Sequence, residues 1–270
     1  MAERMRIVIA GAAGRMGRTL IEGVSADPAL VLAGAIEASG HPRIGHDATD
    51  GIGPPSAVRI TDHAVTAVAA GECIIDFTVP AATLEHVAAC EAAGCAIVIG
   101  TTGFDDAGKA RIAAAAQRIP IVMAPNMAVG VNAAFKLAET AARILGEGYD
   151  IEIIEAHHRH KIDAPSGTAL RLGEVVAKAL GRDLAAESVH GREGITGERR
   201  PRAIGFHAIR GGDIVGEHTV MFAGPGERIE ITVRSSSRMT YALGALRAAK
   251  FLRGRAPGLY DMYAVLGLTT

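Results

Sequence analysis

The stretch MRIVIAGAAGRMG, residues 5–17, decides the fold expected for the first half of the chain. Its first six residues form an apolar run typical of a buried strand, and its glycines at G-x-x-G-x-x-G spacing lead into a pattern over residues 15–25 that predicts a helix. Glycines between a strand and a helix let the backbone approach a pyrophosphate, whose charge is stabilised by free N–H groups where the helix begins. The stretch therefore predicts a dinucleotide-binding loop, with a plain strand-to-helix turn as the alternative.

The alternation of strand and helix continues through the first half of the chain. Further runs typical of buried strands are LVLAGAIE (30–37), ECIIDFT (72–78), CAIVIGTT (95–102) and IPIVMAPN (119–126), with helices predicted over 81–93 and 105–117. This alternation is typical of parallel strands joined by crossover helices. The fold class expected is α/β, with an N-terminal Rossmann-like doubly wound parallel sheet.

The second half of the chain shows a different pattern. Helices are predicted over 131–145 and from 167 to about 180, with the strand IEIIEAHH (151–158) between them, and the arginine-rich segment 181–202 is expected to be a mobile loop. AIGFHAIR, IVGEHTVMFA and RIEITVR alternate with period two, which predicts an antiparallel sheet with one solvated or interface face. We therefore expect a second α+β domain with a mixed or antiparallel sheet.

These patterns predict two domains. Residues 1–128, with 239–270 packing back on them, are expected to form the dinucleotide-binding domain, and residues 129–238 the substrate-binding and oligomerisation domain. Segments near 129–132 and 236–238 are expected to act as hinges.

Composition excludes several other classes. The 270 residues are 49% hydrophobic and carry a net charge of −1, so no positive field recruits nucleic acid or anionic membrane. The three cysteines show no CxxC or metal spacing, which favours a reducing cytoplasm over a disulfide framework. The apolar run at residues 7–10 is too short for a signal sequence or a membrane span. A cytoplasmic protein is expected.

Glu37 and Arg15 give opposite indications about the adenosine end of a cofactor. Glu37 lies about 20 residues past the glycine loop, where a carboxylate accepts hydrogen bonds from ribose hydroxyls, which favours NADH. Arg15 would instead pair with the 2′-phosphate of NADPH. The cofactor is therefore NADH or NADPH.

Two later loops follow strands and should lie at the same carboxyl edge of the sheet. In GTTG, residues 100–103, Thr101 and Thr102 would contact the nicotinamide ribose. In APNMAVG, residues 124–130, Asn126 and Met127 would line the nicotinamide pocket. Each loop has the alternative of a simple turn.

EAHHRHKIDAPSGTA, residues 155–169, places three histidines, an arginine and a lysine together. A metal site is disfavoured because the two cations would repel a metal ion, and no acidic or cysteine ligand has suitable spacing. A plain surface strand would hold fewer histidines. An anionic-substrate site remains: Ser166 or Thr168 caps a helix whose N–H groups hold a carboxylate, Lys161 supplies charge, and a histidine gives a proton.

This stretch resembles the signature of the dihydrodipicolinate (4-hydroxy-tetrahydrodipicolinate) reductase family of lysine and diaminopimelate biosynthesis. DFT at 76–78, GTTG, APNMAVGVN, GFHAIRGGDIVGEHTVMF and SSSRMTYALGAL follow in the family's order. The resemblance implies hydride transfer from NADH or NADPH to the conjugated imine of a small cyclic dicarboxylate, and a homotetramer assembled through the antiparallel sheets.

The resemblance also implies roles for individual residues. His157 would be the acid/base residue and Lys161 a second proton donor, with charge pairing as the alternative for Lys161. Substrate carboxylates would be held by His158, Ser166, Gly167 and Thr168. Cofactor-binding residues would be Gly11, Ala12, Ala13, Gly14, Arg15, Met16, Glu37, Gly100, Thr101, Thr102, Ala124, Pro125, Asn126 and Met127.

Two positions depart from the family, in which glycine is more usual at Ala13 and an aromatic residue at Met127. These departures bear on cofactor affinity and on nicotinamide stacking. Two other functions stay open: a reductase of another small oxo- or imino-dicarboxylate, and a non-catalytic protein that senses NADH.

Overall fold

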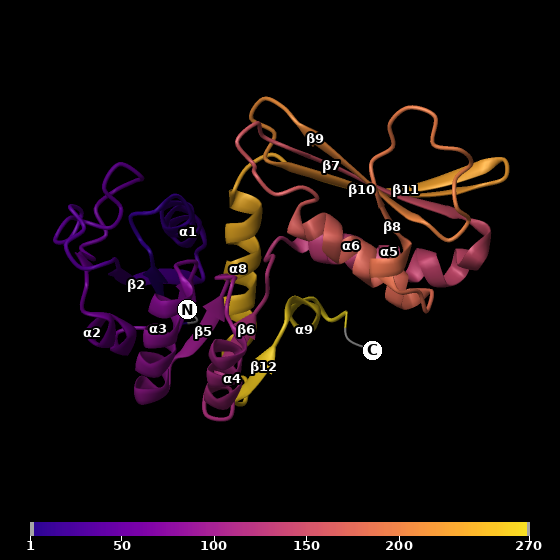
Figure 1. Ribbon diagram of the computed structural model, residues 1–270. Coiled ribbons are helices and arrows are strands. Elements are labelled where there is room, and N and C mark those ends of the chain that lie inside the picture. Colours follow the sequence, from indigo (N-terminus) through magenta and orange to yellow (C-terminus); the bar gives the residue numbers. More distant parts are fainter. Residues whose placement is uncertain (1–2, 269–270) are drawn as a thin grey trace. The chain divides into compact units, whose positions relative to one another are not determined.

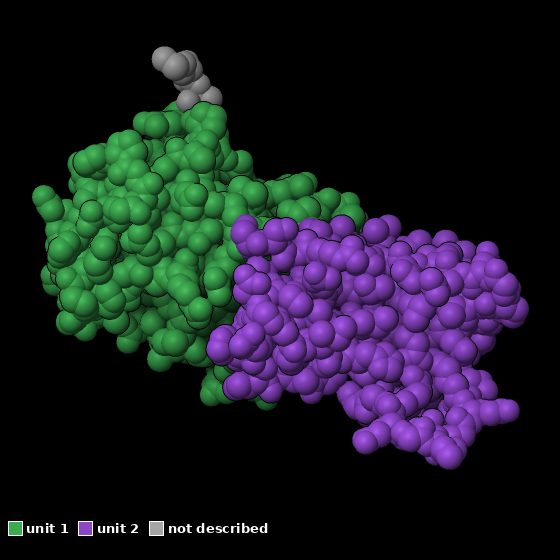
Figure 2. Space-filling model, turned by 90° about the horizontal axis from the view of Figure 1, so that it is seen from above, with its two compact units in different colours: residues 1–129, 238–270 green, residues 130–237 purple. Residues whose placement is uncertain are grey.

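A computed structural model describes residues 3–268, and the chain divides into two compact units. Unit 1 contains the residues up to Val129 together with those from Arg238 onward, and unit 2 is Gly130–Ser237 (Figure 2). The chain thus passes between the units at 129–130 and again at 237–238.

Unit 1 is built on a parallel sheet of seven strands in the order β12-β6-β5-β4-β1-β2-β3 (Figure 1). The strands are β1 (Met5–Ala10), β2 (Leu30–Ile36), β3 (Ile60–Thr61), β4 (Cys73–Asp76), β5 (Ala96–Ile99), β6 (Pro120–Met123) and β12 (Gly258–Tyr260). The helices are α1 (Arg15–Ala26), α2 (Ala64–Ala69), α3 (Pro80–Ala93), α4 (Asp106–Ala115), α8 (Met239–Leu252) and α9 (Met262–Leu266). The strand order reverses between β1 and β4, so the Rossmann-like prediction is confirmed.

Alternate residues of β1 face two separate hydrophobic clusters, because successive side chains of a strand point to opposite faces. Ile7 and Ile9 pack in the cluster covered by α1 and α8, whereas Val8 packs in the cluster covered by α2, α3 and α4. All three side chains are fully buried. The central strands are therefore apolar without alternation, as a sheet covered on both faces requires.

Helix α8 returns the chain to unit 1 and packs closely at the end of β6. A Cβ on Gly244 would lie 1.7 Å from the carbonyl oxygen of Met127, so the helix approaches that backbone at a distance that only glycine permits. After α8, β12 adds a parallel strand beside β6, an element that the sequence patterns did not indicate.

Unit 2 contains a five-stranded mixed sheet in the order β11-β10-β7-β9-β8. Its strands are β7 (Asp150–His157), β8 (Ser188–His190), β9 (Ile204–Arg210), β10 (Gly216–Gly224) and β11 (Glu227–Ser235). Its helices are α5 (Val129–Leu145), which begins at the boundary residue, α6 (Gly167–Ala179) and α7 (Leu184–Glu187), with a 3₁₀ turn at Gly146–Gly148. Figure 1 shows α5 and α6 on one side of this sheet.

The sheet of unit 2 is mixed, which is one of the two expected forms. Strand β10 pairs antiparallel with β7 and β11, but β9 pairs parallel with β7, because α6 and the segment after it carry the chain back across the sheet. That segment, expected to be a mobile loop, contains α7 and β8, and two of its arginines, Arg192 and Arg199, bind the buried carboxylate of Glu152.

Candidate active site

The glycine loop lies at the carboxyl end of β1, beside the point where the strand order reverses. Gly11 has a φ of +67°, and a Cβ on Gly17 would lie 2.0 Å from the carbonyl oxygen of Gly11, so both positions require glycine. Gly14 precedes α1 and offers no side-chain cap, which leaves the first N–H groups of the helix without a side-chain acceptor. These features suit a pyrophosphate and its negative charge.

Glu37 follows β2 and lies against the glycine loop. Its carboxylate accepts hydrogen bonds from the backbone N–H of Ala13 at 2.9 Å and of Ala38 at 3.0 Å. Within residues 3–268, no lysine or arginine forms an ion pair with it. The exposed Arg15 stands where α1 begins. The structure therefore brings Glu37 to the predicted loop.

A buried carboxylate connects the loops after β4 and β5. Asp76 is fully buried and accepts hydrogen bonds from the Thr78 hydroxyl at 2.6 Å, the Thr101 hydroxyl at 3.2 Å and the His86 Nδ1 at 2.7 Å. Burial opposes ionisation, but the bond from His86 and those from Thr78 hold the pKa of Asp76 below its usual value. A Cβ on Gly11 would approach Thr78 within 3.1 Å, so three loops meet at this edge.

Other predicted cofactor residues differ in their exposure. Thr102 is exposed, whereas Thr101 is buried against Asp76. Asn126 accepts a hydrogen bond from the N–H of Ala128. Met127 is only 1% exposed and belongs to the core of unit 1, so its side chain offers little surface to a ligand in this structure.

In unit 2 the end of β7 holds an imidazole against a buried carboxylate. The Nδ1 of His157 lies 2.6 Å from the Oε2 of Glu155, and the two residues share a face of the strand because they are two apart. Glu155 is 1% exposed and also binds both terminal nitrogens of Arg210, each at 2.7 Å, and the N–H of Ser166 at 3.1 Å. Burial opposes ionisation of Glu155, but these partners hold its pKa below the usual value. Burial lowers the pKa of His157, against the opposing effect of Glu155.

Ser166 joins the predicted carboxylate loop to a second histidine. Its Oγ accepts a hydrogen bond from the N–H of Ala169 at 3.2 Å, which caps α6, and lies 2.9 Å from the Nε2 of His218. Burial lowers the pKa of His218 to about 4, so this imidazole is neutral at pH 7. The rings of His218 and His157 are 5.1 Å apart at 73°.

The remaining predicted residues near Ser166 differ in their exposure and in their partners. Gly167 is exposed, and no atom lies within 4 Å of the position that a Cβ would occupy there, so the start of α6 is accessible. The Nδ1 of His158 is buried and has no hydrogen-bond partner among the described residues. The ammonium of Lys161 lies 2.8 Å from the carboxylate of Asp163 and holds the pKa of Asp163 below its usual value.

The sequence patterns did not single out Glu155, Arg210 and His218. The two-residue spacing of Glu155 and His157 on a predicted strand was a usable signal, since it places both side chains on one face. Arg210 and His218 lie in the family stretch GFHAIRGGDIVGEHTVMF but were given no role there, because they come from other strands more than 50 residues along the chain. The same holds in unit 1 for Asp76, which joins loops that are separate in sequence.

Within residues 3–268 no three His, Cys, Asp or Glu side chains are grouped to hold a metal ion, and no helix is long and apolar enough to cross a membrane.

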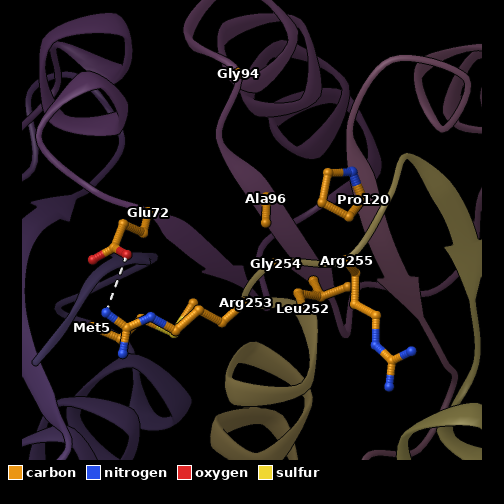
Figure 3. A pocket seen from close by; sticks show the side chains of 9 residues that line it. All are labelled: Met5, Glu72, Gly94, Ala96, Pro120, Leu252, Arg253, Gly254 and Arg255. Carbon is orange, nitrogen blue, oxygen red and sulfur yellow. Dashed lines mark ion pairs between the residues drawn. The ribbon is translucent and has the colours of Figure 1, made fainter. Parts of the chain in front are cut away.

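A pocket of about 210 Å³ in unit 1 is lined by residues that include Met5, Ala96 and Pro120, at the amino ends of their strands (Figure 3). It lies at the opposite end of the strands from the glycine loop, so it is not the cofactor edge.

Comparison with known proteins gives consistent matches over the whole chain. The family model for the N-terminus of dihydrodipicolinate reductase matches residues 5–127, and that for its C-terminus matches residues 130–266. The 4-hydroxy-tetrahydrodipicolinate reductase of Thiobacillus denitrificans is 60% identical over 264 residues, covering 98% of this chain and 99% of the relative. That of Aromatoleum aromaticum is 62% identical, covering 98% and 96%.

A solved structure agrees in fold. The dipicolinate-bound dihydrodipicolinate reductase from Paenisporosarcina sp. TG-14 superposes with a TM-score of 0.77 over 97% of this chain and 98% of that one, at 23% identity.

Proposed function

The chain belongs to the dihydrodipicolinate reductase family, and on that premise we propose that it reduces 4-hydroxy-tetrahydrodipicolinate with NADH or NADPH, a step of lysine biosynthesis. The protein is an NAD(P)H-dependent oxidoreductase of the α/β class. The observation that carries the reaction is the pair of His157 and the buried Glu155, placed beside the open start of α6. A proton donor and an anion site thus lie together in unit 2.

The cofactor is assigned to the carboxyl edge of unit 1. Its pyrophosphate would be held by the loop from Gly11 to Met16, where a side chain on Gly17 has no room, and its adenosine ribose by Glu37. The GTTG loop, anchored through Thr101, and residues 124–127 would bind the nicotinamide half. When bound, the reduced nicotinamide supplies the hydride.

The substrate's carboxylates are assigned to the start of α6. Because Gly167 and Thr168 begin this helix, their N–H groups carry the positive end of the helix dipole. The unpartnered Nδ1 of His158 and the ammonium of Lys161 would complete the site. A carboxylate bound there would compete with Asp163 for Lys161.

The proton is assigned to the Nε2 of His157. The 4-hydroxyl of the substrate leaves as water, which gives the conjugated imine. After hydride adds to this imine, the resulting enamine takes a proton from the Nε2 of His157, while Nδ1 keeps its bond to Glu155. Lys161 acts either as a second donor or by neutralising a carboxylate. Its ion pair with Asp163 supports the second role.

The test is oxidation of NADH and NADPH, followed by absorbance, with substrate generated from pyruvate and aspartate semialdehyde by the preceding synthase. In the His157→Gln variant, kcat should fall about a hundredfold or more, with the dissociation constant of the cofactor unchanged. His160→Gln is the matched control, since His160 is exposed in the same cluster and has no assigned role. A folded, cofactor-binding protein that oxidises neither nucleotide would overturn the proposal.

Lys161→Ala separates the two roles of the lysine. A lost proton donor lowers kcat, whereas a lost carboxylate partner mainly raises KM for the substrate.

We further propose that the protein is a homotetramer assembled through the sheet of unit 2. In β10, Val220 and Phe222 are buried, while Thr219 and Met221 alternate with them on the other face. Light scattering after gel filtration should give four times the mass of one chain, and a monomer would contradict it. Cytoplasmic localisation stays a prediction.

A further inference from the structure

We propose that Glu155 is a positioning residue, which holds His157 so that protons are exchanged only at Nε2 and which ties this imidazole to the loop that binds the substrate's carboxylate. The proposal rests on the proposed function, because it concerns the same proton donor. It goes further by assigning a role to three residues, Glu155, Arg210 and Ser166, as one unit.

The carboxylate of Glu155 is fully occupied by donors. Its Oε2 accepts from the Nδ1 of His157 at 2.6 Å and from one terminal nitrogen of Arg210 at 2.7 Å. Its Oε1 accepts from the N–H of Ser166 at 3.1 Å and from the other terminal nitrogen of Arg210 at 2.7 Å. Four donors on two oxygens fit an ionised carboxylate and prevent it from rotating.

This arrangement determines which nitrogen of His157 reacts. Because Nδ1 faces an acceptor that has no proton to give, it must carry a hydrogen, and Nε2 is left to gain or lose one. The residue beside Nε2 is Gly216, where a Cβ would come within 3.2 Å of that nitrogen. A glycine at this point of β10 keeps Nε2 open.

Among the charged groups that act most strongly on His157, Glu155 is the one that favours its protonation. Burial, Lys161 from the loop and Arg210 from β9 all lower the pKa of His157, and Glu155 opposes them. The neighbouring His218 on β10, with its pKa lowered to about 4, is uncharged at working pH. Without Glu155, the imidazole would be surrounded by cations and would lose its proton at a lower pH.

The carboxylate of Glu155 also holds Ser166, in the loop proposed to bind the substrate's carboxylates. Ser166 donates its N–H to Glu155 and caps α6 with its hydroxyl. Glu155 therefore fixes the position of the start of α6 relative to His157. A shift of the carboxylate would move both the proton donor and the anion site. This coupling is the reason to expect effects on both kcat and KM.

The experiment compares Glu155→Gln with the wild type across pH. The amide keeps the shape but removes the charge and one acceptor. The alkaline limb of the kcat profile should move to lower pH by about 1–3 pH units, and kcat at high pH should fall about tenfold for each pH unit that the limb moves. KM for the substrate should also rise, because Ser166 loses its anchor.

Glu152→Gln is the matched control. Glu152 lies on the same strand and binds two nitrogens of Arg192, the Nε of Arg199 and the Nε2 of His207, so it too has four donors on one buried carboxylate. It makes no bond to His157. Its variant should keep the wild-type pH profile, with kcat within about twofold.

A measurement on the wild type covers the case in which Glu155→Gln does not fold. The measurement is an NMR spectrum of protein with ¹⁵N-labelled histidine. The signals of His157 are assigned because they are absent from the spectrum of His157→Gln. In the neutral form, the imidazole of His157 should carry its hydrogen on Nδ1. A hydrogen on Nε2 in the neutral form would overturn the proposal, as would an unshifted profile in folded Glu155→Gln. If the wild type turns over and His157→Gln does not, the proposed function stands even where the positioning role fails.

Discussion

Replacing Asp76 by asparagine removes one buried charge from the cofactor edge without changing the shape of the side chain. The amide oxygen can take the place of Oδ1 and keep the bonds from the hydroxyls of Thr78 and Thr101. The amide nitrogen then faces the Nδ1 of His86 at 2.7 Å, so the imidazole must change tautomer and accept a hydrogen bond.

The loss is therefore one charge-assisted hydrogen bond in a fully buried site. Hydrogen bonds to charged groups contribute about 1.5–3 kcal/mol, so Asp76→Asn should lower the free energy of unfolding by about 2 kcal/mol at neutral pH. Because the folded-state pKa of Asp76 is lowered, this stabilisation is complete above about pH 4 and is lost as pH falls through the folded-state pKa. The difference between variant and wild type should shrink below about pH 4.

Urea denaturation followed by circular dichroism measures this difference. Asp105→Asn is the control: Asp105 caps α4 by accepting the N–H of Gly108 at 2.7 Å, and asparagine caps a helix equally well, so its effect should stay within about 0.5 kcal/mol. An Asp76→Asn variant as stable as the wild type at neutral pH, or a difference that persists undiminished in acid, would refute the reasoning.

Three further predictions follow from close packing and burial. Gly17→Ala would place a Cβ 2.0 Å from the carbonyl oxygen of Gly11, so the dissociation constant for NADH, measured by fluorescence, should rise about tenfold or more. Gly244→Ala should lower the free energy of unfolding by about 3 kcal/mol in denaturant, despite the better helix propensity of alanine, because its Cβ would overlap the carbonyl oxygen of Met127. The pKa of His218 is about 4 when folded against about 6.5 unfolded, so the unfolded chain binds the extra proton between these values and acid destabilises the fold by about 3 kcal/mol. Replacing His218 by glutamine should reduce this loss between pH 6.5 and 4, as measured by urea unfolding at both pH values; an equal loss in the variant would contradict it.

Local pattern predicted the central strands of unit 1 and the helices α1, α3 and α4. The apolar run at residues 5–10 and the glycine spacing after it predict a strand, a turn and a helix, because strand burial, glycine φ and helix start are all properties of neighbouring residues. Strands β3 and β12 escaped prediction because Ile60–Thr61 and Gly258–Tyr260 are too short to show a period. The parallel pairing of β9 with β7 escaped because alternation reports burial of a face and not strand direction.

In the candidate site, too, some residues were predicted from local sequence and others were found only in the structure. His157, Lys161, Ser166 and Gly167 were predicted as site residues because they lie in one continuous motif. Only the structure showed that the side chain of Met127, a position predicted to line the nicotinamide pocket, is buried in the core.

The sequence by itself determined the central strands of unit 1 with the helices between them, the glycine loop and the family, because each of these depends on residues close together along the chain. Only the tertiary structure decided the partners of the buried charges. Glu155 receives Arg210 from β9, and Asp76 receives His86 from α3 and Thr101 from beyond β5. A buried carboxylate is stable only when hydrogen-bond donors surround it. Folding brings those donors from strands and loops that are far apart along the chain, so no local sequence pattern predicts them.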